Sequence, residues 1–222
     1  VSATTIVPFA NLGEATVTSE VVVLAHALSR VETIENGDIY QYTRFEVMEN
    51  VKGGLAVGAQ FLLRPMSHRS GDYDVDIAGD FSALPDKTYL LFLYKKGDVW
   101  MPMMLSYYVF EQFTIGSEQF LAPVNEQGIE VVNIPGQALP EPLAVYKSSE
   151  LLQNLAKYVH DSSNWDGSPG RTQLLPQDLL PADRAVPVGC DFMLGNSANL
   201  ARWQNAAIPI YYDDTAIPPN WN

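Results

Sequence analysis

Short apolar runs separated by turn residues fill the first 135 positions of the chain. Residues 39–51 (IYQYTRFEVMENV) alternate between apolar and polar positions, whereas residues 87–96 (KTYLLFLYKK) are apolar on both faces. Alternation is typical of a half-buried strand, and a continuous apolar run is typical of a central one. Further strands are predicted at 20–34, 60–66, 73–77, 99–105, 107–115, 119–124 and 129–134. Strands so closely spaced predict a mainly β fold, with a closed or nearly closed barrel or a sandwich over residues 1–135.

The turn between the first two long strands gives the strongest local signal. Its sequence is Glu35-Asn36-Gly37-Asp38. An Asn-Gly pair readily adopts the two positive φ angles that a two-residue type I′ turn requires. The sequence therefore predicts a long β-hairpin that runs from residue 20 to residue 51.

A helical pattern follows the strands, over residues 148–160 (SSELLQNLAKYVH). Ser148 or Ser149 is placed to act as the N-cap, and Glu150 lies in the first turn, where a negative charge stabilises a helix. Apolar residues recur at the spacing of one helical stripe, namely Leu151, Leu152, Leu155, Tyr158 and Val159. We therefore expect this helix to dock on the β domain through its leucines. A second, short helix is predicted near residues 10–18.

The composition changes after this helix. Residues 161–184 are polar and rich in Pro and Gly, which is typical of a linker or an extended segment. A short apolar strand then recurs at 208–212, close to Trp203. We therefore divide the chain into a β-barrel domain at 1–135, a helix with an extended, Pro-rich linker at 136–200, and the start of another unit at 201–222.

The chain is acidic, with 13 basic and 26 acidic residues and a formal net charge of −13. Binding to nucleic acid requires clustered Lys and Arg that neutralise phosphates, and attraction to an anionic membrane requires the same. Neither partner is expected here. In addition, no apolar run approaches the roughly 18 residues of a membrane-spanning helix.

Histidine and cysteine are sparse. His26, His68 and His160 lie far apart along the chain, whereas closed zinc sites usually show tight ligand spacing, so these three residues do not predict a zinc site. Cys190 is the single cysteine. It is interpreted as a buried thiol, as half of a disulfide, or as a thiolate that caps a metal.

Four carboxylates form a cluster in the segment GDYDVDIAGD, namely Asp72, Asp74, Asp76 and Asp80. The spacing resembles a calcium-binding loop, but Ile77 and Ala83 stand where an EF-hand needs its Gly and its bidentate Glu. In a strand, Asp72, Asp74 and Asp76 would instead share one face. We favour a solvated outer face over a calcium site.

Several of the predicted strands follow a pattern similar to that of a domain found in secreted bacterial proteins. The pattern has an apolar strand, a strand that ends in F-x-V-x-x-x-x-K-G, a third strand and a final apolar strand. Phe45, Val47, Lys52 and Gly53 match the second element, and Leu91, Phe92 and Leu93 match the last. Members often have a Gly in the first strand, where this chain has Ala25 and His26. The resemblance implies a small OB-like or netrin-like barrel.

The end of the chain is similar to a second family. Residues 201–221 (ARWQNAAIPIYYDDTAIPPNW) resemble the entry strand of matrixin-like zinc metallopeptidases. The two resemblances together imply a secreted or cell-surface bacterial protein, of which this chain is the non-catalytic N-terminal pro- or accessory region. The zinc motif of that family, H-E-x-x-H followed by a third His, is absent from the sequence. The chain alone is therefore predicted to be inactive, with no cofactor of its own and zinc expected only in a downstream catalytic domain.

The partner that this resemblance implies is the downstream catalytic domain or another protein. Two other functions stay open. One is a free-standing β-barrel module for binding or adhesion at a cell surface. The other is an inhibitor-like module, although such netrin-like inhibitors usually contain several disulfides and this chain has one cysteine.

The resemblance to matrixin-like peptidases also bears on Cys190. In that family a cysteine upstream of the catalytic domain can hold the enzyme latent by filling the fourth zinc position. Cys190 lies just upstream of the matching stretch, but its context, VPVGCDF, lacks the P-R-C-G-x-P-D pattern of the family. The neighbouring Asp191 disfavours a thiolate because it carries a like charge. Latency, a disulfide and a structural thiol are the three hypotheses for this residue.

Overall fold

The structure is a computed structural model that describes residues 3–124, 129–132, 134–136, 139–161, 165 and 170–172. This part of the chain is mainly β, as predicted. The strands are β1 (Thr4–Ile6), β2 (Val21–Glu35), β3 (Asp38–Lys52), β4 (Gln60–Leu63), β5 (His68–Ser70), β6 (Tyr73–Val75), β7 (Thr88–Lys96), β8 (Val99–Pro102), β9 (Val109–Ile115), β10 (Glu118–Pro123), β11 (Ile129–Val131), β12 (Val145–Lys147) and β13 (Arg171–Thr172). The helices are α1 (Leu12–Thr18) and α2 (Ser148–Lys157).

Five strands close a small barrel in the order β2–β3–β4–β8–β7, and β7 pairs again with β2. Neighbouring strands are antiparallel except β4 and β8, which run parallel where Leu63 pairs with Trp100. A small closed barrel of five strands is the architecture of OB-like folds. The prediction of a closed, OB-like barrel is confirmed.

The first half of β2 and residues 89–93 of β7 are buried on both faces. Alternate residues such as Val23 and Leu91 point into the barrel, and the residues between them, such as Val22 and Phe92, pack against the helices outside it. Each of these four side chains is fully buried. This double burial explains why residues 89–93 of β7 form a continuous apolar run, since a strand with one solvent-exposed face alternates instead.

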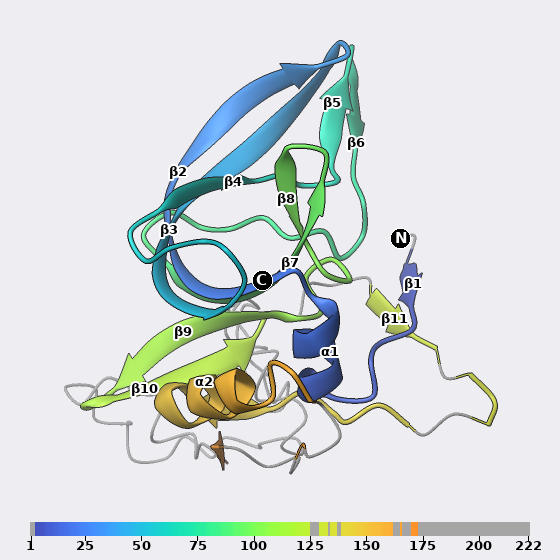
Figure 1. Ribbon diagram of the computed structural model, residues 1–222. Coiled ribbons are helices and arrows are strands. Elements are labelled where there is room, and N and C mark those ends of the chain that lie inside the picture. Colours follow the sequence, from blue (N-terminus) through green and yellow to red (C-terminus); the bar gives the residue numbers. More distant parts are fainter. Residues whose placement is uncertain are drawn as a thin grey trace, which may run out of the picture.

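The two helices cover the outside of the barrel, on the side away from the tip of the long hairpin (Figure 1). Helix α1 begins after Asn11, whose side chain accepts a hydrogen bond from the Glu14 N–H at 2.9 Å. Helix α2 buries Leu151, Leu152 and Leu155, as the leucine stripe predicted. Both predicted helices are therefore confirmed.

The predicted N-cap of α2 is wrong. Lys147 is the N-cap and makes no side-chain capping bond. The Ser148 hydroxyl instead accepts a hydrogen bond from the Gln112 amide at 2.9 Å, which ties the helix to β9. The helix also ends at Lys157, before the predicted His160.

The sheet continues beyond the barrel. β9 pairs with the first half of β7, and β10, β12 and β13 follow in order. The short strands β1 and β11 form a separate parallel pair. β1, β5, β12 and β13 were not predicted. The strand predicted at 99–105 ends at Pro102, because Met104 and Leu105 adopt positive φ angles of 52° and 61° and turn the chain.

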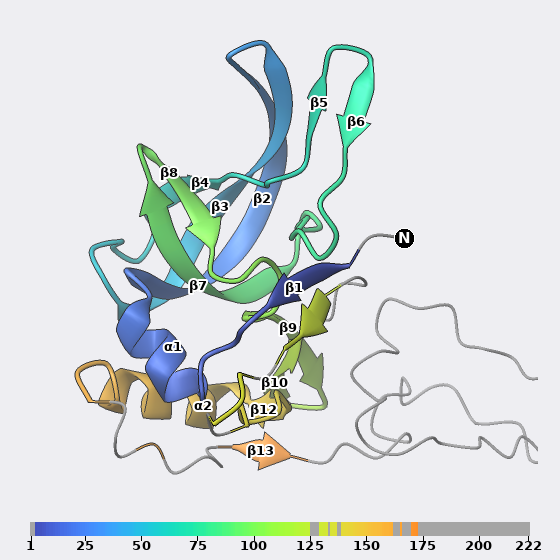
Figure 2. The same cartoon turned by 90° about the vertical axis from the view of Figure 1, so that its right-hand side faces the viewer.

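The far half of the β2–β3 hairpin leaves the barrel and stands above it (Figures 1 and 2). The register of the hairpin shifts between Ala27 and Ser29, which marks a β-bulge, and bulges bend strands. Beyond this point β5 pairs with β3, and β6 pairs with β5. We call the resulting four-stranded sheet, made of residues 29–42 with β5 and β6, the arm. At its tip Asn36 and Gly37 have φ angles of 53° and 93°, as the predicted type I′ turn requires.

Candidate functional site: a cleft beneath the arm

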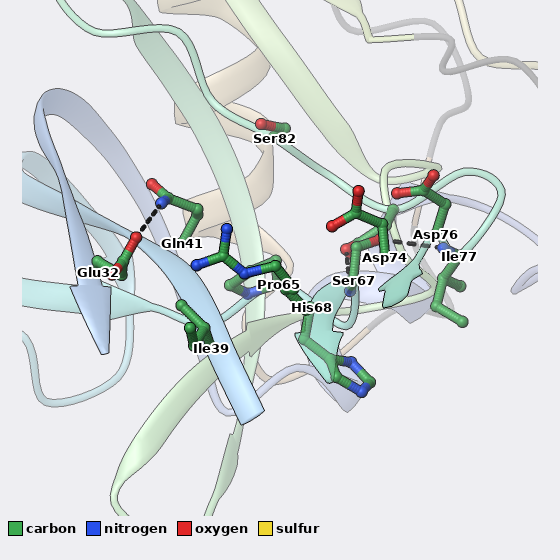
Figure 3. A pocket seen from close by; sticks show the side chains of 12 residues that line it. Glu32, Ile39, Gln41, Pro65, Ser67, His68, Asp74, Asp76, Ile77 and Ser82 are labelled. Carbon is green, nitrogen blue, oxygen red and sulfur yellow. Dashed lines mark hydrogen bonds between the residues drawn. The ribbon is translucent and has the colours of Figure 1, made fainter. Parts of the chain in front are cut away.

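A cleft of about 460 Å³ lies between the arm and the loop that follows β6 (Figure 3). Its volume falls within the range of small-ligand pockets, roughly 300–1,000 Å³. The lining residues come from both hairpins and from the loop, and they are Glu32, Ile39, Gln41, Pro65, Ser67, His68, Arg69, Asp74, Asp76, Ile77, Asp80 and Ser82. We treat this cleft as the candidate binding site.

Asp80 fixes the loop that forms one side of the cleft. Its two carboxylate oxygens accept hydrogen bonds from the backbone N–H groups of Ser67, at 2.7 Å, and Phe81, at 3.0 Å. The Ser67 hydroxyl accepts a further bond from the Ile77 N–H at 3.0 Å. Asp80 is therefore committed to holding the loop against the segment before β5.

The long hairpin forms the opposite wall. The Gln41 amide donates a hydrogen bond to the Glu32 carboxylate at 3.2 Å, across the two paired strands (Figure 3). Arg30 ties this wall to the loop, since its guanidinium donates to the Ala83 carbonyl at 3.0 Å and to the Ser82 hydroxyl at 3.1 Å. Side-chain contacts therefore hold both walls in place.

Three charged side chains in the cleft have no partner among the described residues. Arg69, Asp74 and Asp76 form no side-chain hydrogen bond or ion pair with any residue that the structure describes. Glu32 and Asp80 add two further negative charges to the lining. Carboxylates thus outnumber the guanidinium, and the charges of Arg69, Asp74 and Asp76 are available to a ligand.

The opposite face of the arm is braced by a network around Glu35. The Tyr42 hydroxyl and the Arg64 guanidinium both donate to the Glu35 carboxylate, the latter at 3.0 Å. Arg64 also lies over the Tyr40 ring, 4.0 Å from its centroid, and the His68 ring stacks on the same tyrosine with centroids 4.9 Å apart. Burial, together with the hydrogen bond to Glu35 and its charge, raises the pKa of Tyr42 to about 12.

This network joins β2, β3, β5 and the residue after β4. Cation–π and charge-assisted contacts of this kind hold side chains in one arrangement. The inner face of the arm is therefore presented to the cleft by a fixed sheet.

The cleft contains no nucleophile–base pair among its described residues. Ser67 and His68 are adjacent in the chain, but the Ser67 hydroxyl is bonded to a backbone N–H. The His68 ring interacts with the Met66 carbonyl at 3.0 Å and lies 3.8 Å from the Asp38 carboxylate, on the other face of the arm.

Metal-binding residue types are also dispersed. Within the described ranges, no group of three or more His, Cys, Asp or Glu side chains could hold a metal ion. His26 lies in β2 and interacts with the Thr88 hydroxyl at 3.2 Å, whereas His68 lies in the arm and His160 follows α2. The three histidines belong to separate regions.

The acidic cluster is divided between two roles. Asp74 and Asp76 are exposed in the cleft, whereas Asp80 anchors the loop and Asp72 lies in the turn between β5 and β6. Sequence reasoning missed Glu32, Gln41 and Arg69. The signal that could have found Arg69 is the hairpin around Gly71-Asp72, where the short segments His68–Ser70 and Tyr73–Val75 flank a turn.

The residues that carry the resemblance to secreted domains are structural. Phe45 and Val47 are buried inside the barrel. The Lys52 ammonium donates to the backbone carbonyls of Thr16, Val17 and Ser19 at 3.0, 2.6 and 2.6 Å, so it caps the end of α1. Burial lowers the pKa of Lys52.

Gly53 lies where the chain passes close to β2. Its φ angle is 96°, and a Cβ atom there would lie 2.6 Å from both the Glu20 carbonyl oxygen and the Val21 side chain. The Lys-Gly pair thus docks α1 and the end of β3 against the barrel. It contributes nothing to the cleft.

Cys190 and the stretch 201–222 lie outside the residues that the structure describes. Within those residues, neither helix is long and apolar enough to cross a membrane. Comparison with family models, with curated proteins and with solved structures finds no match. The likeness to OB-like folds therefore rests on the strand order of the barrel.

Proposed function

We propose that this chain is a non-catalytic binding module whose cleft holds part of a partner protein. The observation that carries the proposal is the set of unpartnered charged side chains, Arg69, Asp74 and Asp76, that line one cleft. Charged groups at an interface mainly set the choice of partner and the rate of association.

The rigidity of the arm supports the same function. The Tyr42–Glu35–Arg64 contacts on its outer face restrain the sheet before any ligand arrives. A restrained site loses less conformational entropy on binding than a flexible one. The cleft is thus suited to recognition by a preformed surface.

A photocrosslinking side chain at position 41 tests this proposal. In the secreted proteins of the native host, we expect a discrete crosslinked product that excess unmodified protein competes away. A Ser82→Trp variant should not compete, because the indole fills the cleft, whereas Ser117→Trp, at the exposed β9–β10 turn, should compete normally. An equally strong product from a crosslinker at position 117 would contradict the proposal.

A second proposal concerns the protein to which the module belongs. We infer that it is the N-terminal accessory or pro-region of a secreted, matrixin-like bacterial zinc metallopeptidase, with a netrin-like barrel. The observation that favours this is the similarity of residues 201–221 to the entry strand of those peptidases. The cleft then serves the catalytic domain or one of its protein substrates.

Reading the gene beyond Asn222 tests this second proposal. An encoded H-E-x-x-H motif with a third His would support it, and a stop codon directly after Asn222 would overturn it. In the full gene, a Cys190→Ser variant separates the hypotheses for that residue. Premature peptidase activity at normal yield indicates latency, whereas lower yield with unchanged latency indicates a disulfide or a packing role.

A further inference from the structure

Paired residues form a row across the inner face of the arm. Ile34 of β2 pairs with Ile39 of β3, Ile39 pairs with Arg69 of β5, and Arg69 pairs with Asp74 of β6. Directly paired residues point to the same face of a sheet, and neighbouring strands lie about 4.8 Å apart. The row therefore changes from apolar at β2 to charged at β6.

The charged end of the row continues into the cleft. Asp76 lies two residues beyond Asp74 and lines the cleft with it (Figure 3). Glu32 lies on the opposite wall, where its carboxylate accepts a hydrogen bond from the neutral amide of Gln41. It forms no ion pair with any described residue. A cation that enters the cleft thus meets carboxylates on two sides.

From this pattern we propose that the cleft binds an extended partner segment that carries a lysine or arginine. The cationic side chain lies between Asp74 and Asp76, and an apolar side chain two residues away, on the same face of the extended segment, lies toward Ile39 and Ile34. Arg69 donates hydrogen bonds to the backbone carbonyls of the segment. This inference rests on the proposed binding function and names the chemistry of its partner.

Charge complementarity is the reason for choosing a basic segment over an acidic one. The lining has four carboxylates and one guanidinium, and the whole chain has a net charge of −13. Both the local and the long-range field therefore attract a cation and repel an anion. The exposed Ile34, at 70% accessibility, supplies apolar contact area beside the charges.

The test uses fluorescence anisotropy with two labelled peptides, a Val-Ser-Lys-Ser repeat and a Val-Ser-Glu-Ser repeat, in which Val and the charged residue share one face of the extended chain. At low salt, we expect saturable binding of the Lys peptide at least tenfold tighter than of the Glu peptide. The double variant Asp74→Asn/Asp76→Asn should weaken binding of the Lys peptide about tenfold. Arg69→Gln should strengthen it about twofold, because the Gln amide still donates a hydrogen bond to the segment while a like charge is removed.

A matched control separates the cleft from net charge. Asp86→Asn/Asp98→Asn removes the same charge from two exposed turns outside the cleft, and Asn tolerates the positive φ of 61° at position 86. This variant should bind the Lys peptide within about twofold of the parent. Equal weakening by both double variants, equal binding of the two peptides, or no saturable binding would each overturn the inference.

Failure here is distinguishable from failure of the proposed function. The crosslinking at position 41 and its block by Ser82→Trp do not depend on the sign of the ligand charge. If the crosslink persists while the Lys peptide fails, the cleft binds a partner of other chemistry.

Discussion

The two halves of the β2–β3 hairpin are formed by the same two strands, yet their side chains are used differently. In the barrel half, Val22 and Val23 are fully buried on opposite faces of β2. In the arm half, Ile34 is 70% exposed, and Tyr73 of the adjoining hairpin is 78% exposed. Burial on both faces makes the first half a source of stability. The second half leaves side chains free to contact another molecule.

The arm compensates for its small core with side-chain contacts. Hydrogen-bond, ion-pair and cation–π contacts on one face join Tyr40, Tyr42 and Glu35 of the arm to Arg64, which follows β4. The other face has free charges at the cleft. We therefore assign rigidity to one face of the arm and binding to the other, whereas in the barrel half of β2 both faces are buried in the core.

The largest expected effect is in the barrel core. Phe45 is fully buried, stacks on Phe61 with centroids 5.5 Å apart, and meets Tyr89 edge-on at 6.2 Å. Phe45→Ala should lower the free energy of unfolding by about 4 kcal/mol, because it removes a large apolar side chain and leaves a cavity. Urea denaturation measures the change, and a loss below about 1 kcal/mol would mean that the barrel core collapses to fill the space.

The next effect concerns the connection between α1 and the barrel. Gly53→Ala should cost about 3 kcal/mol, since the added Cβ meets the Glu20 carbonyl and the left-handed backbone disfavours a side chain. Gly54→Ala is the matched control, because a Cβ there has no atom within 4 Å. Thermal unfolding should separate the two variants clearly, and similar melting temperatures would refute the close approach seen at Gly53.

A smaller effect is expected from the brace of the arm. Tyr42→Phe removes the hydrogen bond to Glu35, so it should cost about 1.5 kcal/mol at neutral pH. The pH dependence of stability gives a second readout, because burial and the contact with Glu35 together raise the pKa of Tyr42. The pKa of Tyr42 is raised from 10.0 to about 12 in the folded protein, so between these values the unfolded state binds fewer protons and stability falls as pH rises.

The parent protein should therefore lose stability more steeply than Tyr42→Phe between about pH 10 and pH 12. Chemical denaturation at a series of pH values measures both curves. Parallel curves would show that folding does not raise the pKa of Tyr42, and would contradict its burial beside Glu35.

The smallest effect is expected at the exposed tip of the arm. Ile34→Thr keeps a β-branched side chain in the strand and removes little buried surface, so the free energy of unfolding should change by less than about 0.5 kcal/mol. The same denaturation assay applies. A loss as large as that of Phe45→Ala would show that the arm and the barrel share one core, which would remove the contrast between them.

Patterns of neighbouring residues in the sequence were sufficient to predict much of the fold. The Asn36-Gly37 turn, the two-sided apolar run of β7 and the leucine stripe of α2 each depend on neighbouring residues. The N-cap of α2 could not be predicted, because Ser148 is engaged by Gln112 from a strand far away in the sequence. Four short strands were missed because their pairing partners lie elsewhere in the chain.

The candidate site was predictable only in part. Asp74, Asp76 and Asp80 stood out as a cluster, but the sequence did not separate the anchoring role of Asp80 from the free carboxylates. Arg69 joins them through its pairing with Ile39, and that register is set by β3 and β5 together. Such a contact has no signature in the local pattern of either segment.

The pairing of β1 has a consequence for the order in which the chain folds. Thr4 pairs with Ile129, and the Glu141 N–H donates to the Ala10 carbonyl at 2.7 Å, so more than half of the sequence separates these partners. Closing so long a loop costs more entropy than closing the β2–β3 hairpin, and contacts distant in sequence form slowly. During synthesis, β1 emerges before β11 and cannot form this pair until the barrel strands and β11 have followed it.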